Sequence, residues 1–195
     1  MLCKAGHVLR DAPAAAISWR FRLAMRRNPS QWLAVGRAVA RFFPPMFEDF
    51  APKTLAAVKQ AEELAKQLGD ESVATGHIIY GLTVDKSVCL HHIFQDLNVD
   101  PDMFSGYVKS LPREPQVPNG PFNRHVNTVF VRSRDAAKDL GSKVVQPEHL
   151  ALALMSVKAG SCYETLKEFS IDPEYISSLI MQAMGLPPEA SPEWF

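Results

Sequence analysis

The sequence predicts an all-α protein whose body is a pseudo-twofold bundle of two four-helix repeats. Two observations predict this fold: the chain repeats itself at a fixed offset, and the apolar residues of each copy recur at helical spacing. In addition, no alternating apolar and polar run is long enough to require a strand. The 195 residues, 47% of them hydrophobic and 22% charged, have the composition of an ordinary globular protein.

The repeat relates residues that lie 72 positions apart, and it runs without a gap. Identical residues recur at this offset in the following pairs: Phe50 and Phe122, Ala65 and Ala137, Lys66 and Lys138, Leu68 and Leu140, Gly69 and Gly141, Val73 and Val145, His77 and His149, Leu82 and Leu154, Asp100-Pro101 and Asp172-Pro173. Chance does not account for agreement at so many apolar and helix-ending positions. The body is therefore predicted to consist of two copies of one supersecondary unit.

Each copy begins with a predicted amphipathic helix. In the first copy, apolar residues recur every three or four positions until Gly69, which is expected to end the helix in the left-handed conformation. In the second copy the corresponding helix ends at Gly141. The two apolar stripes consist of Leu55, Val58, Ala61, Ala65 and Leu68, and of Val126, Val129, Phe130, Ser133, Ala137 and Leu140.

Three shorter helices are predicted after the first one in each copy. Thr75 is expected to cap the second helix, whose counterpart opens with Pro147, at a position where the missing N–H group costs nothing. A third helix spans about residues 87–96. A fourth helix follows Asp100, or Asp172 in the second copy, because a capping carboxylate there precedes a proline.

The predicted domain organisation has three parts. Residues 1–45 form a basic amphipathic segment for transit or anchoring, residues 46–185 form the double repeat, and residues 186–195 form a flexible tail. The three parts differ in composition, which is the usual sign of a boundary.

Within the body, repeat one covers residues 46–110 and repeat two covers residues 122–185. Residues 111–121 between them form a proline linker, in which proline recurs at every third position from Pro112 to Pro121. Because this is the period of the polyproline II helix, the linker is expected to be extended, although the same pattern also suits a P-x-x-P ligand.

The net charge of zero hides an uneven distribution. Over the whole chain, 21 Lys and Arg residues balance 21 Asp and Glu residues. Up to Pro45, however, eight basic residues and one acidic residue give a net charge of +7, so that the remainder carries −7. The break coincides with the start of the repeat at Met46 and indicates two segments with different roles.

The basic segment has the composition of an organellar transit peptide. It is rich in Arg and contains two amphipathic stretches, separated at Asn28-Pro29-Ser30. In the second stretch, Arg37 and Arg41 share one helical face beside apolar residues. Two alternatives remain open, namely a first helix native to the fold and a true start at Met46.

The expected location is a plastid stroma or a mitochondrial matrix, or the cytoplasm if the chain starts at Met46. No run of 18 apolar residues occurs, so no transmembrane helix is predicted. Three cysteines without C-x-x-C spacing favour a reducing compartment.

Two short runs at equivalent places in the copies carry a family pattern. The first copy contains the run from Gly76 to Leu82, after Met46-Phe47-Glu48-Asp49-Phe50, and the second contains Pro147-Glu148-His149-Leu150. These runs resemble the double Clp N-terminal repeat of Clp-type AAA+ unfoldases, over essentially all of residues 46 to 183. The chain is also similar to the small plastid proteins that accompany the Clp protease core.

The resemblance implies a bundle of eight helices that receives adaptors and substrate proteins. In some bacterial relatives, an acidic residue before the His of each copy grips a phosphorylated arginine. The second such position is Glu148 here but the first is Gly76, and the hydroxyl expected after each Phe is replaced by Ala51 and Asn123. The resemblance therefore leaves Glu148 as the candidate ligand-binding residue, with one carboxylate where the relatives have two.

The sequence shows none of the common enzyme motifs. A G-x-x-x-x-G-K-[ST] phosphate loop is missing, as are the G-x-S-x-G, H-E-x-x-H and G-x-G-x-x-G patterns. We therefore predict that the protein is not an enzyme and has no catalytic residue, cofactor or metal.

Two groups of residues are of types that bind metals or act in catalysis, but a purely structural role is the simpler interpretation of both. Cys89, His91 and His92 are metal-ligand types, but on a helix His91 points away from the other two, so a packed thiol and surface histidines are expected. His77 and His149 are expected to be helix-start or core histidines with a satisfied hydrogen bond.

The leading functional hypothesis is a non-catalytic accessory or adaptor module of a Clp chaperone–protease system. It would bind Clp ATPase or protease subunits, substrates or adaptors, and it would not bind nucleic acid. The alternative is a structural subunit of another organellar protein complex, repurposed from the same fold.

Overall fold

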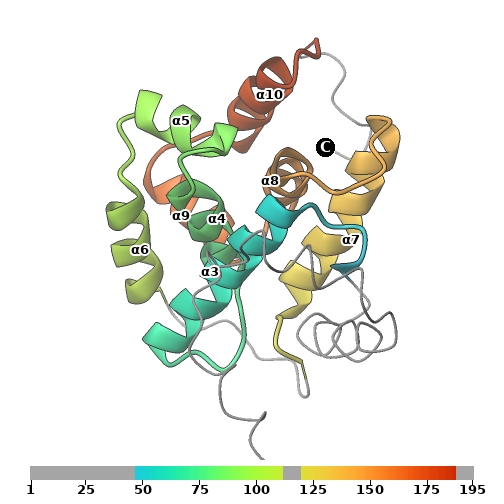
Figure 1. Ribbon diagram of the computed structural model, residues 1–195. Helices are drawn as coiled ribbons and strands as arrows, with labels where there is room; N and C mark the ends of the chain where they lie inside the picture. The colour runs from blue at the N-terminus through green and yellow to red at the C-terminus, as the bar shows by residue number, and fades with distance from the viewer. Residues whose placement is uncertain (1–46, 112–119, 188–195) are drawn as a thin grey trace, which may run out of the picture. The chain divides into compact units, whose positions relative to one another are not determined.

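The computed structural model describes residues 47–111 and 120–187, and within them it contains eight α-helices and no strand. The helices are α3 (Pro52–Leu68), α4 (Thr75–Val84), α5 (Cys89–Asp96), α6 (Pro101–Ser110), α7 (Arg124–Asp139), α8 (Pro147–Ser156), α9 (Gly160–Glu168) and α10 (Pro173–Ala183), as Figure 1 shows. Helices α3–α6 form the first copy and α7–α10 the second. The predicted all-α fold of two four-helix repeats is confirmed.

Several predictions concern parts of the chain outside the described residues. These parts are the basic segment, residues 112–119 of the linker and the last eight residues of the tail. The boundaries between the parts therefore stay predictions. Among the described helices, none is long and apolar enough to cross a membrane.

The helix ends follow the predicted signals in most places. Gly69 and Gly141 have φ angles of +72° and +70°, a left-handed conformation that glycine adopts without steric cost, and the first helix of each copy stops there. The Asp172 carboxylate caps α10 by accepting a hydrogen bond from the backbone N–H of Glu174 at 3.0 Å.

Thr75 does not cap α4, contrary to the prediction. Ala74 occupies the cap position, and Thr75 is the first residue of the helix. The Thr75 side chain is fully buried, and its hydroxyl accepts a hydrogen bond from the backbone N–H of Cys162 at 3.0 Å. The prediction failed because the hydroxyl satisfies a donor at the start of α9, in the other copy, instead of one in its own helix.

Helices α4 and α8 lie at the centre of the bundle. Every residue of α8 except Glu148 is buried, as expected for a helix that is apolar on all sides. Helix α3 packs on α4, and α7 packs on α8. Each central helix also contacts the third helix of the other copy, in the pairs α4 with α9 and α8 with α5.

Two parallel backbone bridges join the copies crosswise. Phe50 pairs with Val145, and its repeat equivalent Phe122 pairs with Val73. In the first bridge the backbone N–H of Ala51 donates to the carbonyl of Val145 at 2.9 Å, and in the second that of Asn123 donates to the carbonyl of Val73 at 3.0 Å. Each bridge thus pairs one residue of the first copy with one of the second. The copies are joined twice in the same way, as the two subunits of a symmetric dimer are.

Candidate functional site

The predicted site residue Glu148 lies in the first turn of α8, where a carboxylate is favoured by the helix dipole. Its repeat equivalent, Gly76, lies in the first turn of α4. A histidine follows each of them, so the first turns of α4 and α8 can be compared position by position.

His77 and His149 hold the backbone at the two helix starts. The ring Nδ1 of His77 accepts a hydrogen bond from the backbone N–H of Ala74 at 2.9 Å, and that of His149 accepts one from Gln146 at 3.0 Å. These are the cap residues of α4 and α8, so each histidine occupies the third helical position of a capping box. The prediction of helix-start histidines with a satisfied hydrogen bond is confirmed.

The other ring nitrogen differs between the copies. Because Nδ1 accepts, a neutral ring carries its proton on Nε2. In His77, Nε2 lies 3.2 Å from the Asp70 carboxylate, whereas the His149 ring hydrogen-bonds the backbone of Val144. Burial lowers the pKa of His149 below its usual value, and the opposing effects of the Glu148 charge and the Val144 hydrogen bond are smaller.

The lowered pKa of His149 predicts a loss of stability in weak acid. The unfolded chain binds a proton near pH 6.5 more readily than the folded one, so this contribution is complete above that pH and is lost as the pH falls. We expect wild type to lose more stability than His149→Gln between pH 7.5 and 5.5, by no more than about 1.4 kcal/mol per pH unit for one proton. Urea unfolding at the two pH values measures this. Glutamine keeps an acceptor for the backbone N–H at the start of the helix. An equal loss of stability in both proteins would contradict the lowered pKa of His149.

Glu148 contacts the thiol of Cys89 at the start of α5. Burial raises the pKa of Cys89 to about 12, and the negative charge of Glu148 and a hydrogen bond to its carboxylate act in the same direction. The thiol therefore stays protonated at neutral pH and is not a nucleophile. Glu148 itself is half-buried, so its side chain is partly accessible to solvent.

In the first copy, the position equivalent to Glu148 is Gly76, and neighbouring side chains fill the space around it. The backbone N–H of Gly76 donates to the Ser161 hydroxyl at 2.8 Å, and Ser161 is the repeat equivalent of Cys89. A Cβ atom at Gly76 would lie 2.9 Å from Ser161 Oγ and 3.0 Å from a methyl carbon of Val108. A carboxylate side chain does not fit there without movement, so the two sites are chemically different.

The two positions that carry a hydroxyl in some relatives are Ala51 and Asn123 here, and both residues make other contacts. The Ala51 N–H takes part in the bridge to Val145, and Ala51 has no polar side-chain atom. The Asn123 side chain is buried, and its oxygen accepts the backbone N–H of Val126 at 2.8 Å as the cap of α7. Neither side chain offers a hydroxyl for a phosphate.

Residues 121–193 match the family model described as the Clp repeat (R) N-terminal domain. The N-terminal domain of the chaperone ClpD from Arabidopsis thaliana aligns at 19% identity with a TM-score of 0.52, covering 73% of this chain and 99% of that one. The Hsp104 N-terminal domain from Candida albicans aligns at 16% identity with a TM-score of 0.59, covering 74% and 100%. The fold is that of a Clp N-terminal domain.

The chain is also similar in sequence to Clp chaperones. The chloroplastic chaperone ClpD1 of Oryza sativa subsp. japonica is 26% identical over 186 residues, which cover 90% of this chain and 19% of that protein. The chaperone ClpB of Bacteroides thetaiotaomicron is 29% identical over 116 residues, or 58% and 14% of the two chains. The chain thus spans less than a fifth of the length of these relatives.

The cysteine and histidines of α5 make separate contacts. The Cys89 thiol faces Glu148, while the His91 ring is buried and its Nδ1 donates to the carbonyl of Thr83. His92 is exposed, as predicted, but the prediction that His91 lies on the surface is wrong. The error arose because α5 packs against both α4 and α8, which bury more than one face of it. Among the described residues, no three His, Cys, Asp or Glu side chains are grouped to hold a metal.

Proposed function

We propose that this Clp N-domain protein is a non-catalytic accessory or adaptor module of a Clp chaperone–protease system. The observation that carries the proposal is the complete set of eight helices of the Clp N fold, in two crosswise-joined copies. Its function would be to bind Clp subunits or substrate proteins.

Within this role, Glu148 would bind a cationic group of the protein partner. The carboxylate is half-buried beside a neutral thiol. Ala51 and Asn123 supply no hydroxyl, so the site would take an arginine or lysine side chain without preference for a phosphorylated arginine. A charge-assisted hydrogen bond of this kind contributes about 1.5–3 kcal/mol.

The proposed location is the plastid stroma. Two of the relatives, ClpD1 of rice and ClpC of Pisum sativum, are named as chloroplastic proteins. The Arg-rich composition of residues 1–45 agrees with a transit peptide, although this segment lies outside the described residues.

Affinity purification from plastids of the protein's own cells tests the proposal. The tagged wild-type protein is expected to recover Clp ATPase or protease subunits, and its own first residue is expected to lie beyond residue 45. Glu148→Gln should reduce the recovery about tenfold or more, which matches the loss of one charged hydrogen bond. Glu71→Gln, which changes an exposed carboxylate elsewhere, should leave recovery unchanged.

Two outcomes would contradict the proposal in different ways. Recovery of a large assembly without Clp subunits would instead support a structural subunit of another complex. Equal recovery by wild type and Glu148→Gln would remove Glu148 from the interface but leave the Clp association in place. Binding of purified subunits to peptides with arginine or phosphoarginine would then identify the ligand class.

A further inference from the structure

Two exposed apolar surfaces occupy equivalent places in the two copies. In the described part of the chain, four large apolar side chains are exposed, namely Met103, Val131, Val144 and Tyr175. Met103 and Tyr175 are 72 positions apart, and their exposed fractions are 55% and 52%. By contrast, Val131 and Val144 correspond to the polar residues Lys59 and Ser72, so their exposure is not shared between the copies.

The first surface lies where α6 packs on the end of α9. Met103 and Tyr107 are four residues apart on one face of α6, and the Tyr107 ring meets the half-buried Phe169 ring at 5.9 Å. The Tyr107 hydroxyl donates to the Glu168 carboxylate at 3.4 Å, which keeps an acidic group at the edge of the apolar side chains. We call these residues, Met103, Tyr107, Glu168 and Phe169, the α6 surface.

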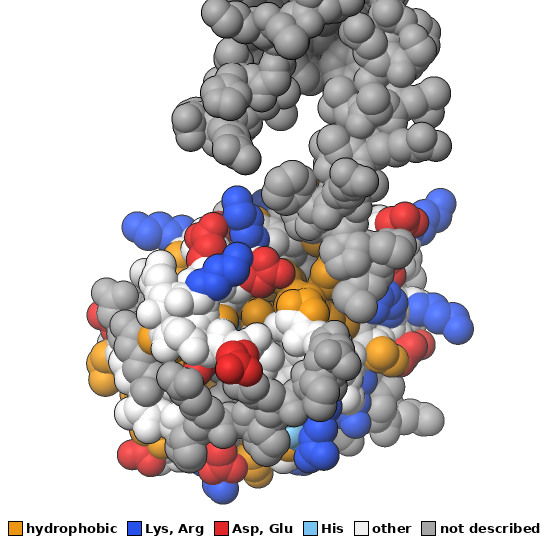
Figure 2. All heavy atoms as spheres, turned by 90° about the horizontal axis from the view of Figure 1, so that it is seen from below, with side chains coloured by type: hydrophobic (Ala, Val, Ile, Leu, Met, Phe, Trp, Pro, Cys, Tyr) orange, Lys and Arg blue, Asp and Glu red, His pale blue; other side chains and the backbone are white. Residues whose placement is uncertain are grey.

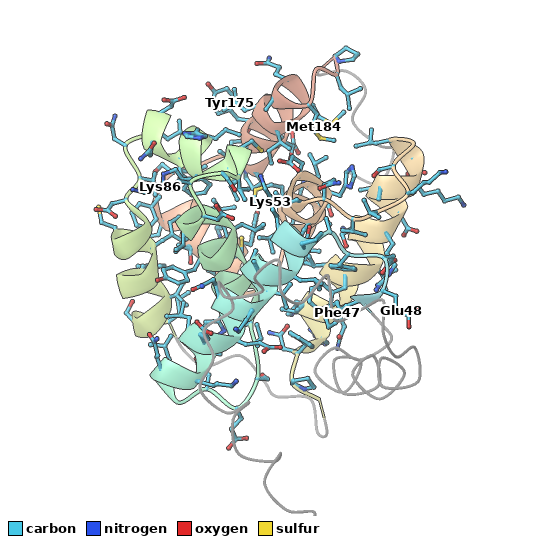
Figure 3. The ribbon with its side chains drawn as sticks, in the orientation of Figure 1. Phe47, Glu48, Lys53, Lys86, Tyr175 and Met184 are labelled. Atoms are coloured by element: carbon cyan, nitrogen blue, oxygen red, sulfur yellow. The ribbon has the colours of Figure 1, made fainter. Side chains whose placement is uncertain are left out.

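The second surface lies where α10 packs on the end of α5. Its residues stand 72 positions from those of the α6 surface: Tyr175 for Met103, Leu179 for Tyr107, Asp96 for Glu168 and Leu97 for Phe169. Tyr175 lies on the outside of α10, near the top of the view in Figure 3. We call this set the α10 surface. Both surfaces join one copy's fourth helix to the other copy's third helix.

Charge decides what kind of partner fits these surfaces. Glu168 and Asp96 are exposed at their edges, as is Asp172, which precedes α10. The exposed Lys167 and Lys158 nearby are each paired with a further carboxylate, that of Glu164 and that of Glu174. A second copy of this chain would bring like charges together, which disfavours self-association. Figure 2 shows one face of the molecule, on which acidic and basic side chains surround a hydrophobic centre.

We propose that the α6 and α10 surfaces are two equivalent docking sites for basic amphipathic helices of partner proteins. The apolar stripe of such a helix would cover Met103 or Tyr175, and its Lys or Arg residues would pair with the acidic rim. Methionine and tyrosine suit this role because one adapts its shape and the other presents a large rigid contact area. The two surfaces contain neither Glu148 nor Cys89, and their test does not depend on Clp subunits.

The test measures binding of a fluorescent 16-residue Lys/Leu amphipathic peptide to the purified chain by anisotropy and calorimetry. We expect two sites per chain, one site in Met103→Ser or Tyr175→Ser, and at least a tenfold loss of affinity in the double variant. Raising the salt concentration should weaken binding, because the rim is exposed. Both substituted side chains are already exposed, so circular dichroism melting curves should stay unchanged.

Three controls make the proposal falsifiable. Val131→Ser changes an equally exposed apolar side chain outside both surfaces and should bind like wild type. An acidic amphipathic peptide with Glu in place of Lys, and a scrambled Lys/Leu peptide without an apolar stripe, should not bind. Wild-type affinity in the double variant, or equal binding of the acidic peptide, would overturn the proposal. Glu148→Gln should leave peptide binding unaltered, so that failure here is distinguishable from failure of the Clp proposal.

Discussion

Replacing Gly81 with alanine is expected to lower the free energy of unfolding by about 3 kcal/mol, near the upper end of the usual cost of overpacking. A Cβ atom at this position would lie 2.1 Å from the backbone carbonyl oxygen of Ala57 and 3.2 Å from the backbone nitrogen of Ala61. Both atoms belong to α3, and a helix backbone cannot move away as a side chain can. Helices α3 and α4 would therefore have to separate along their whole contact.

A matched substitution isolates the cause of this effect. Gly106 lies inside α6, and a Cβ atom there would meet nothing within 4 Å. Gly106→Ala should therefore gain roughly 0.5–1 kcal/mol from helix propensity alone. Urea unfolding measures both variants, and the melting temperature of Gly81→Ala should fall by roughly 6–12 °C. Equal behaviour of the two variants would refute the close approach of α3 and α4.

The second large effect is expected for Gly76→Glu, which restores the carboxylate of the first copy. The substitution should lower the free energy of unfolding by about 1–3 kcal/mol, because its Cβ atom would press on Ser161 Oγ at 2.9 Å and on Val108. It would also disturb the hydrogen bond from the Gly76 N–H to the Ser161 hydroxyl. The start of α9 would have to shift away from α4.

A double-mutant cycle tests this explanation. Ser161→Gly removes two of the three atoms nearest to the added Cβ, so Gly76→Glu should cost less in its presence, with a coupling energy of about 1 kcal/mol. Gly76→Ala should show most of the destabilisation of Gly76→Glu, since the first side-chain carbon already makes the contact. Urea unfolding of the four proteins gives the cycle. A Gly76→Glu protein as stable as wild type would show that the first copy can hold a second carboxylate.

Local signals in the sequence predicted the helices correctly. The left-handed stops at Gly69 and Gly141 and the Asp172 cap depend on a few neighbouring residues, so the pattern contains the information needed. His77 and His149 were predicted to be helix-start or core histidines with a satisfied hydrogen bond, because they occupy equivalent places in the repeat. Thr75 and His91 were misassigned because their partners, Cys162 and the packed faces of α5, lie in other elements.

The candidate site was predicted only in part. Glu148 was identified from the resemblance to the family, and Cys89 was expected to be a packed thiol, but the contact between the two was not predicted. The repeat contained a signal that could have identified it, since Cys89 and Ser161 are 72 positions apart and each meets the residue before a histidine. This relation indicates a contact only once it is known that the third helix of each copy packs on the second helix of the other.

The sequence by itself determined that this protein is two copies of a four-helix unit, where most of the helices stop, and that one copy keeps a carboxylate that the other lacks. The tertiary structure alone decided that the copies join crosswise, Phe50 to Val145 and Phe122 to Val73. It also decided that Ser161 and Val108 close the first site and that Met103 and Tyr175 remain exposed. The physical reason is that an apolar stripe shows which face of a helix is buried but not which helix covers it.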